Sequence, residues 1–261
     1  MADKKTAAAP AGRPLQGAVG TPMGNTLTIA KREFLAYFNS PMGYIIIALF
    51  ALLLGILYFF LFGSLVLRRA TLQPLFTSMS WLMPLICGAI SMRTFAEERR
   101  LGTIELLITM PVRDAEVIIG KFLGAMGLLV CALSVTLVYP IAVAQMGDLD
   151  WGPVRGAYVG LILGGGAYIA LGMLVSSYSR DQISAFFVSF FLGYLFFLLD
   201  KGLIFMGTGM ITSIIEYMCF DFHFKSIARG VIDSRNVIFF ASVIGACLLA
   251  TARSLDRRRW S

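Results

Sequence analysis

The chain has 261 residues, of which 58% are hydrophobic and 14% are charged, whereas soluble globular domains are about 45–50% apolar and about 25% charged. This composition excludes an ordinary soluble domain, and it also excludes a disordered chain, which lacks apolar residues. A net charge of +7 would suggest nucleic acid in a soluble protein, but in a membrane protein cationic residues collect on the cytoplasmic side. We therefore expect an all-α integral membrane protein that binds no nucleic acid.

The N-terminal part of the chain predicts a tail followed by a surface helix. Residues 1–24 are rich in Ala, Pro and Gly and lack the apolar core of a secretory signal, so we interpret them as a flexible cytoplasmic tail. From Asn25, apolar residues recur at helical spacing opposite a polar face, and Pro41 should end this helix. The stretch 25–42 is too short and too polar to cross a bilayer, and we expect an amphipathic helix lying along the membrane interface.

Six apolar runs follow in a transmembrane region at 43–253, and each is predicted to cross the bilayer as a helix of roughly 20 residues. Pro140 should kink the third run near its outer end. Glycines 164–166 and Gly172 in the fourth run favour close approach of neighbouring helices. Residues 254–261 are expected to form a basic cytoplasmic tail. The runs are 44–67, 72–92, 116–146, 157–178, 184–206 and 237–252.

The distribution of Lys and Arg predicts the orientation of the spans. With the N-terminus inside, fifteen of the 22 basic residues fall on inner segments and seven on outer segments, which places both termini in the cytoplasm. Two longer polar stretches result, an inner loop at 93–115 and an outer loop at 207–236. We expect the function to lie in these loops and in the span faces between them.

The inner loop carries a charged cluster at 97–100, which needs water or a protein partner. Gly102 allows a turn after it, and Thr103 is a suitable N-cap for a short helix at 104–109. That helix has an apolar stripe, for which two interpretations are open. The stripe either dips into the membrane interface or, as we prefer, docks a cytoplasmic partner.

Two motifs resemble a known family. The run FAEERRLGTIELLITMPV at 95–112, followed by GKF at 120–122, resembles the coupling-helix segment of type-2 ABC exporter permeases, above all the gliding-motility (GldF-like) and copper-site maturation (NosY-like) branches. The run HFKSIARGVIDSRNV at 223–237 is similar to the extracellular segment before the last span in that family. The resemblance extends over the chain from Thr26. It implies a half-transporter that pairs with a second permease subunit, identical or different, and with two cytoplasmic ATPase subunits.

The chain also lacks an ATP-binding motif of its own. Its only Gly-Lys pair, Gly120-Lys121, is followed by Phe122 inside a span, so it is not a Walker A motif. We therefore expect no enzyme, no catalytic residue and no cofactor in this chain, with ATP and Mg bound by the ATPase partner. The resemblance implies that the following residues contact the ATPase: Glu97, Glu98, Arg99, Gly102, Thr103, Glu105, Leu106, Lys31, Arg32 and Glu33.

The remaining polar residues suggest packing more than chemistry. Asp200 and Lys201, late in the fifth span, should snorkel or pair near the outer end, and the alternative is a place in the translocation path. Lys121 should extend toward the inner interface. The only histidine and four scattered cysteines predict no metal site. In the outer loop, Arg229 and Asp233 are four positions apart and could pair on one helix face. The expected outer cap comprises His223, Arg229, Asp233 and Arg235.

Taken together, these patterns predict a permease subunit in the bacterial inner membrane, surrounded by lipids. It would couple ATP hydrolysis in another subunit to export, or to force transmission onto a periplasmic partner, and we favour the gliding-motility branch. The alternative is a secondary transporter or channel without an ATPase partner. Such a protein needs an ionisable pathway at the bilayer midplane, where these spans are almost free of carboxylates.

Overall fold

The computed structural model describes residues 22–61, 72–100, 102, 113–146, 149–203, 217–231 and 233–256. Six helical segments in these ranges are long and apolar enough to cross a membrane, and the ranges contain no strand. The predicted all-α, six-span fold is thereby confirmed. The elements are α1 (Pro22–Asn39), α2 (Pro41–Ile56) with the π-helical turn η1 (Leu57–Leu61), α4 (Gln73–Ser91), α5 (Arg93–Arg100), α7 (Asp114–Val135), α8 (Val138–Met146), α9 (Trp151–Tyr178), α10 (Gln182–Leu203), α12 (Phe220–Ala228) and α13 (Ser234–Asp256).

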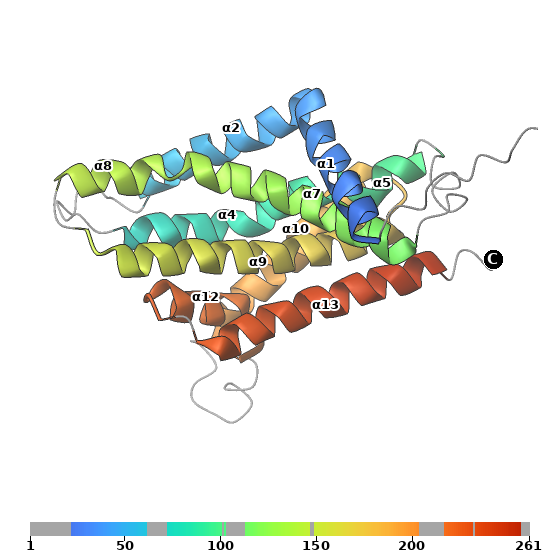
Figure 1. Ribbon diagram of the computed structural model, residues 1–261. Helices are drawn as coiled ribbons and strands as arrows, with labels where there is room; N and C mark the ends of the chain where they lie inside the picture. The colour runs from blue at the N-terminus through green and yellow to red at the C-terminus, as the bar shows by residue number, and fades with distance from the viewer. Residues whose placement is uncertain are drawn as a thin grey trace, which may run out of the picture.

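The spans lie side by side in an elongated bundle whose two ends carry different short helices (Figure 1). At one end, here called the α5 end, lie α5, the start of α7 and the ends of α9 and α13. At the other, here called the α12 end, lie α8, α12 and the start of α9. The buried charged side chains of the described residues, Glu116, Lys121 and Asp221, lie at these two ends.

Helix α9 runs through the middle of the bundle, and its residues 164–173 are all buried. Glycine allows the neighbouring helices to come close. A Cβ atom on Gly165 would collide with Leu129 of α7, and one on Gly172 would collide with Ser91 of α4. The close helix approach predicted from these glycines is therefore present.

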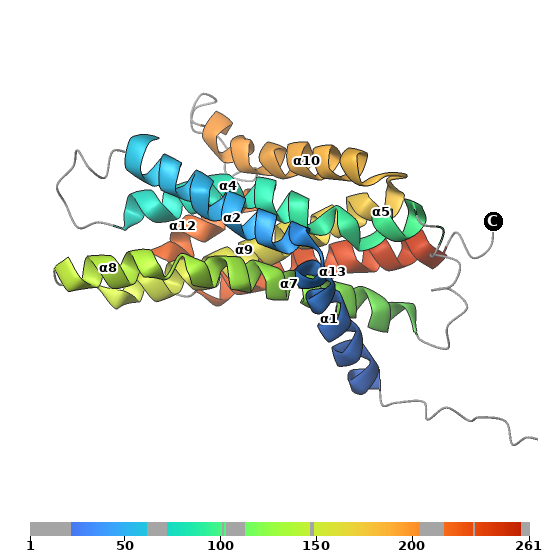
Figure 2. The same ribbon diagram turned by 90° about the horizontal axis from the view of Figure 1, so that it is seen from above.

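Helix α1 packs obliquely across α7 (Figure 2). Gly120, Gly124 and Gly127 of α7 lie under it, and a Cβ atom on any of them would come within 2.7–2.8 Å of an α1 side-chain atom. Such distances are shorter than real contacts allow, so α1 would have to shift to admit a larger residue at any of these positions. The helix ends at Asn39, followed by Ser40 in an extended conformation and Pro41 at the start of α2, as the proline predicts.

Proline interrupts the third span, between α7 and α8. Pro140 has no N–H to donate to the carbonyl of Thr136, and its ring crowds that carbonyl. The break falls at Thr136 and Leu137, four and three residues before the proline, so the predicted kink is confirmed.

A side chain from another helix interrupts the second span at Met92, between α4 and α5. The hydroxyl of Ser176 on α9 accepts hydrogen bonds from the N–H groups of Phe95 (3.2 Å) and Ala96 (3.0 Å) and donates one to the Met92 carbonyl (3.2 Å). A polar group inserted into the helical ladder in this way is a recognised cause of a helix break.

The second span therefore extends further than the sequence suggested. The stretch 93–100, assigned to a loop from the sequence, is helical as α5. Of the residues that follow, Gly102 is described, whereas the coupling helix expected at 104–109 lies outside the described residues.

Candidate functional site

A buried lysine joins three helices at the α5 end. Lys121 of α7 is 2% exposed, and its Nζ lies 2.7 Å from Glu98 Oε1 on α5 and 3.1 Å from Glu33 Oε1 on α1. We call these three residues the junction cluster. The expectation that Lys121 would extend to the interface was wrong, because two carboxylates inside the bundle hold its charge and remove the need for water.

A second ion pair fixes α5 to the joint between α1 and α2. Arg93 binds the carboxylate of Glu97 one turn later with two hydrogen bonds, of 2.6 and 3.1 Å, and donates a third, of 2.8 Å, to Ser40 Oγ. Nearby, the Tyr37 hydroxyl of α1 donates to the Ile90 carbonyl of α4 at 2.8 Å. Burial raises the pKa of this hydroxyl well above its usual value, so Tyr37 remains a hydrogen-bond donor.

Arg99 connects α5 to the end of α9. Its guanidinium donates to the carbonyl oxygens of Ser177 and Tyr178, which belong to the last turn of α9 and lack intrahelical partners. Three members of the charged cluster at 97–100 thus bond within the chain, and Arg100 is exposed. The proposed docking residues Glu97, Glu98 and Arg99 therefore hold α5 in place, whatever else they contact.

Other expected docking residues face outward. Lys31 and Arg32 on α1 are exposed, as is Gly102, where the chain turns with φ +68, a conformation that favours glycine. Thr103, Glu105 and Leu106 lie outside the described residues. Among described residues, the exposed basic side chains at this end are Lys31, Arg32, Arg100, Arg113, Arg180 and Arg253, against the exposed acid Asp181.

At the α12 end, one buried carboxylate holds two lysines. Asp221 of α12 lies 2.8 Å from Lys201 at the end of α10 and 2.9 Å from Lys225 one turn away, and it accepts a hydrogen bond from Ser80 at 3.1 Å. Burial by itself raises the pKa of Asp221, but the two lysines outweigh burial and hold that pKa below its usual value. Lys201 therefore pairs, and its pairing partner comes from the outer loop. The side chain of Asp200 lies outside the described residues.

The residues expected to form an outer cap are packed around α12 and the start of α13. The ring of His223 is buried and stacks on Phe239 at 3.9 Å between centroids. Its Nδ1 lies 2.7 Å from the Asn236 side-chain oxygen, and its Nε2 lies 2.8 Å from the Tyr217 carbonyl oxygen. Both ring nitrogens of His223 are thus within hydrogen-bond distance of oxygen atoms of the chain. The described residues contain no group of His, Cys, Asp or Glu suited to a metal ion.

The expected pairing of Arg229 with Asp233 on one helix face is wrong. Helix α12 ends at Ala228, and Gly230, with φ +91, turns the chain. Asp233 instead accepts a hydrogen bond from the Arg235 N–H (3.0 Å) at the start of α13. Arg229 and Arg235 are both exposed.

The family model described as ABC-2 family transporter protein matches residues 71–220, which is more than half of the chain. The chain belongs to the ABC-2 transporter family. This ABC-2 permease is a multi-pass membrane subunit, not itself catalytic, of the kind that works with an ABC ATPase. The matched region begins just before α4 and includes α5, Lys121 and Ser176. No curated protein matches the chain.

Sequence reasoning placed Lys121 near the inner end of its span but missed its buried pairing with two glutamates, and it missed the contacts that Tyr37 and Ser176 make at the α5 end. A signal existed for Lys121, because a lysine in an apolar run requires a counter-ion or water and two glutamates stand in the segments that flank its end of the bundle. No local pattern marks Ser176 or Tyr37, whose partners lie 81 and 53 residues away.

Proposed function

We propose that this chain is the permease of a type-2 ABC exporter and that a separate ATPase docks on its α5 end. The observation that carries the proposal is the junction cluster. Helix α5 leads directly into the segment at 101–112 that resembles a coupling helix, and Lys121 ties α5 to both α1 and α7. A movement of that segment would thereby displace both α1, the interfacial helix, and α7, the first part of the third span.

The charge distribution supports a cytoplasmic location for the α5 end. Among described residues, exposed basic side chains outnumber exposed acids six to one there, against four to two at the α12 end. By the positive-inside rule, the α5 end faces the cytoplasm of a bacterial inner membrane, with both termini on that side. The exposed charges of α1 then flank the ATPase contact, where charge governs partner choice and orientation more than affinity.

The docking surface therefore has two parts. Lys31 and Arg32 form the first, with Glu33 directed inward to Lys121. The turn at Gly102 and the residues Thr103, Glu105 and Leu106 form the second. The full assembly contains two ATPases and a second permease subunit, either a copy of this chain or a related one.

A secondary transporter or channel is less well supported. Among described residues, the middle third of each candidate span has no Asp, Glu, Lys, Arg or His. The Asp, Glu, Lys and Arg residues of the described spans lie toward the span ends, where Lys121 and Arg93 pair with glutamates. Proton or ion coupling needs such groups within the membrane, so ATP-driven movement fits this chain better. Export and gliding-motility-type force transmission would use the same ATPase contact.

The test is purification of the tagged chain from its native membrane in mild detergent, followed by mass spectrometry of the proteins that accompany it. An ATPase subunit should accompany the wild type and Arg235→Gln, an exposed cation at the α12 end, and should be lost with Glu105→Arg. A co-purifying periplasmic protein would identify the force-transmission branch. Wild-type chain that brings down no ATPase and moves solute or ions alone in vesicles would overturn the proposal.

A further inference from the structure

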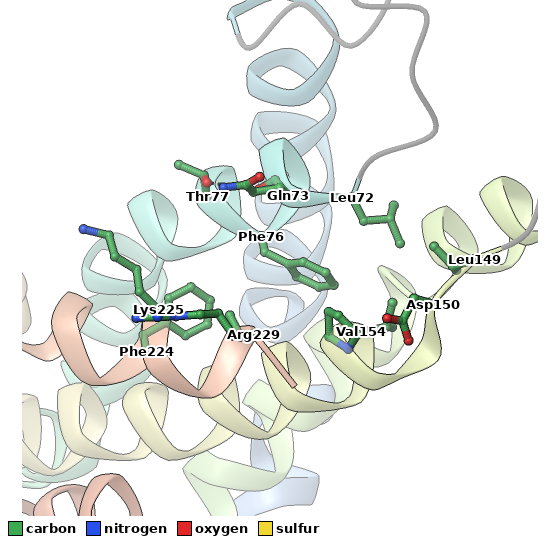
Figure 3. Close-up of a pocket in the computed structure, with 12 residues that line it drawn as sticks. Leu72, Gln73, Phe76, Thr77, Leu149, Asp150, Val154, Phe224, Lys225 and Arg229 are labelled. Carbon is green, nitrogen blue, oxygen red and sulfur yellow. Dashed lines mark hydrogen bonds between the residues drawn. The ribbon is translucent and has the colours of Figure 1, made fainter. Parts of the chain in front are cut away.

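A cavity of about 710 Å³ opens at the α12 end, where the first turns of α4 and α9 meet α12 (Figure 3). Its volume lies in the range of small-molecule sites, about 300–1,000 Å³. The inner wall is apolar and takes one residue from each helix: Phe76 of α4, Val154 of α9 and Phe224 of α12. All three are buried, so this wall is a fixed part of the core.

The mouth of the cavity is charged, and its α12 side is cationic. Lys225 and Arg229 line it one turn apart, and both are exposed. Lys225 shares the carboxylate of Asp221 with Lys201, so this single acid is divided between two lysines and does not offset the charge of Arg229. On the opposite side lies Asp150, whose carboxylate accepts the Gly152 N–H at 2.9 Å and caps α9.

The ends of the spans indicate the depth of this mouth in the membrane. The candidate spans of α4 and α9 begin at Gln73 and Trp151. Gln73 lines the cavity, and Trp151, which is 43% exposed, directly follows the lining residue Asp150. Tryptophan concentrates at the headgroup level of bilayers. The mouth therefore lies at headgroup level, and Phe76 and Val154 lie one turn further into the span.

We propose that this cavity binds a membrane phospholipid, with its phosphate at Lys225 and Arg229 and the start of an acyl chain along Phe76, Val154 and Phe224. An inorganic anion would use the mouth and leave the apolar wall empty. An apolar solute would use the wall but would bring no anion to the α12 side of the mouth, where Lys225 and Arg229 lie. A phospholipid satisfies both and is present at that depth in every membrane.

The test measures stabilisation of the delipidated, purified full chain by phosphatidylglycerol, with thermal unfolding followed across a lipid titration. Arg229→Gln should raise the lipid concentration needed about fivefold, the effect of one cation at a membrane surface. Thr77→Phe and Leu149→Phe fill the cavity from two partly exposed positions on different sides, and both should abolish the response. Arg235→Gln removes an exposed cation outside the cavity and should respond as the wild type does.

The unfolding temperature of each variant is first measured without lipid, and only variants with the wild-type unfolding temperature enter the comparison. Equal responses from the wild type and from the Arg229 and cavity-filling variants would mean general lipid solvation and would refute the site. Stabilisation by inorganic phosphate equal to that by phosphatidylglycerol would also refute it, since a soluble anion would then be the ligand. The proposal is independent of ATPase docking, because Arg229→Gln should leave ATPase co-purification unchanged.

Discussion

Replacing Lys121 by Met tests whether the junction cluster holds the α5 end together. The substitution keeps a long side chain but leaves Glu33 and Glu98 facing each other without the cation between them. Removing one partner from a buried pair costs about 3–5 kcal/mol. The two carboxylates remain 20% and 19% exposed and gain some relief from water, so we expect the lower end, about 3 kcal/mol. At about 2–4 °C per kcal/mol, the unfolding midpoint should fall by roughly 6–12 °C.

The assay is thermal unfolding in one detergent at fixed pH and salt, and the control removes all three charges. The triple variant Lys121→Met, Glu33→Gln, Glu98→Gln leaves no uncompensated charge, and replacing a whole buried ion cluster is often close to neutral. It should therefore recover most of the loss. Two results would refute the reasoning: a single variant that unfolds within about 2 °C of the wild type, or a triple variant less stable than the single one.

Three further predictions concern the packing around α9 and α12. Gly156→Ala should lower the free energy of unfolding by about 1–3 kcal/mol, because the new Cβ would collide with a backbone carbonyl of α12. The control Gly245→Ala meets nothing within 4 Å and should leave stability unchanged. Equal unfolding midpoints for the two variants would show that α12 can move away from α9. Ser176→Ala should lower the free energy of unfolding by about 1–3 kcal/mol and speed amide hydrogen exchange in α5. Ser179→Ala should do neither, because the Ser179 hydroxyl bonds to the Val175 carbonyl of its own helix. Because the folded pKa of Asp221 is lowered, its ionised form stabilises the fold above the ordinary pKa of about 3.9, and that stabilisation is lost as the pH falls through the folded pKa. The gap in unfolding temperature between the wild type and Asp221→Asn should thus be constant from about pH 5 to 8 and close below about pH 4; a gap that widens in acid would contradict this assignment.

Features that depend on neighbours in the sequence were predictable. The apolar runs placed six spans, Pro41 ended α1, and Pro140 broke the third span, because each signal acts within one turn of helix. The pair Arg93–Glu97 has the spacing at which residues meet on a helix face, but the sequence assigned this stretch to a loop, so the pair was not predicted. The glycine spacing at 120, 124 and 127 also marks one face of α7, although it does not name the helix that packs there.

Features that depend on distant partners were not predictable. Lys121 and Glu33 are 88 residues apart in the sequence. No periodicity in either segment indicates that α1 crosses α7 at Lys121. A lysine near the end of a span commonly reaches water, and only the fold shows that two carboxylates intervene. Ser176 likewise resembles any serine near the end of a helix until α5 is placed against it.

The packing of α1 on α7 bears on the order in which the chain assembles during synthesis. Among the described helices α1 leaves the ribosome first, but Lys121, on the face of α7 that receives it, is made 88 residues after Glu33. At about 5–20 residues per second, that delay lasts roughly 4–18 s. Until then Glu33 lacks Lys121, and α1 can contact only the first two spans, as Tyr37 does with the Ile90 carbonyl. A nascent chain that stops after the second span would therefore hold α1 on one side only, and insertion of the third span completes its packing.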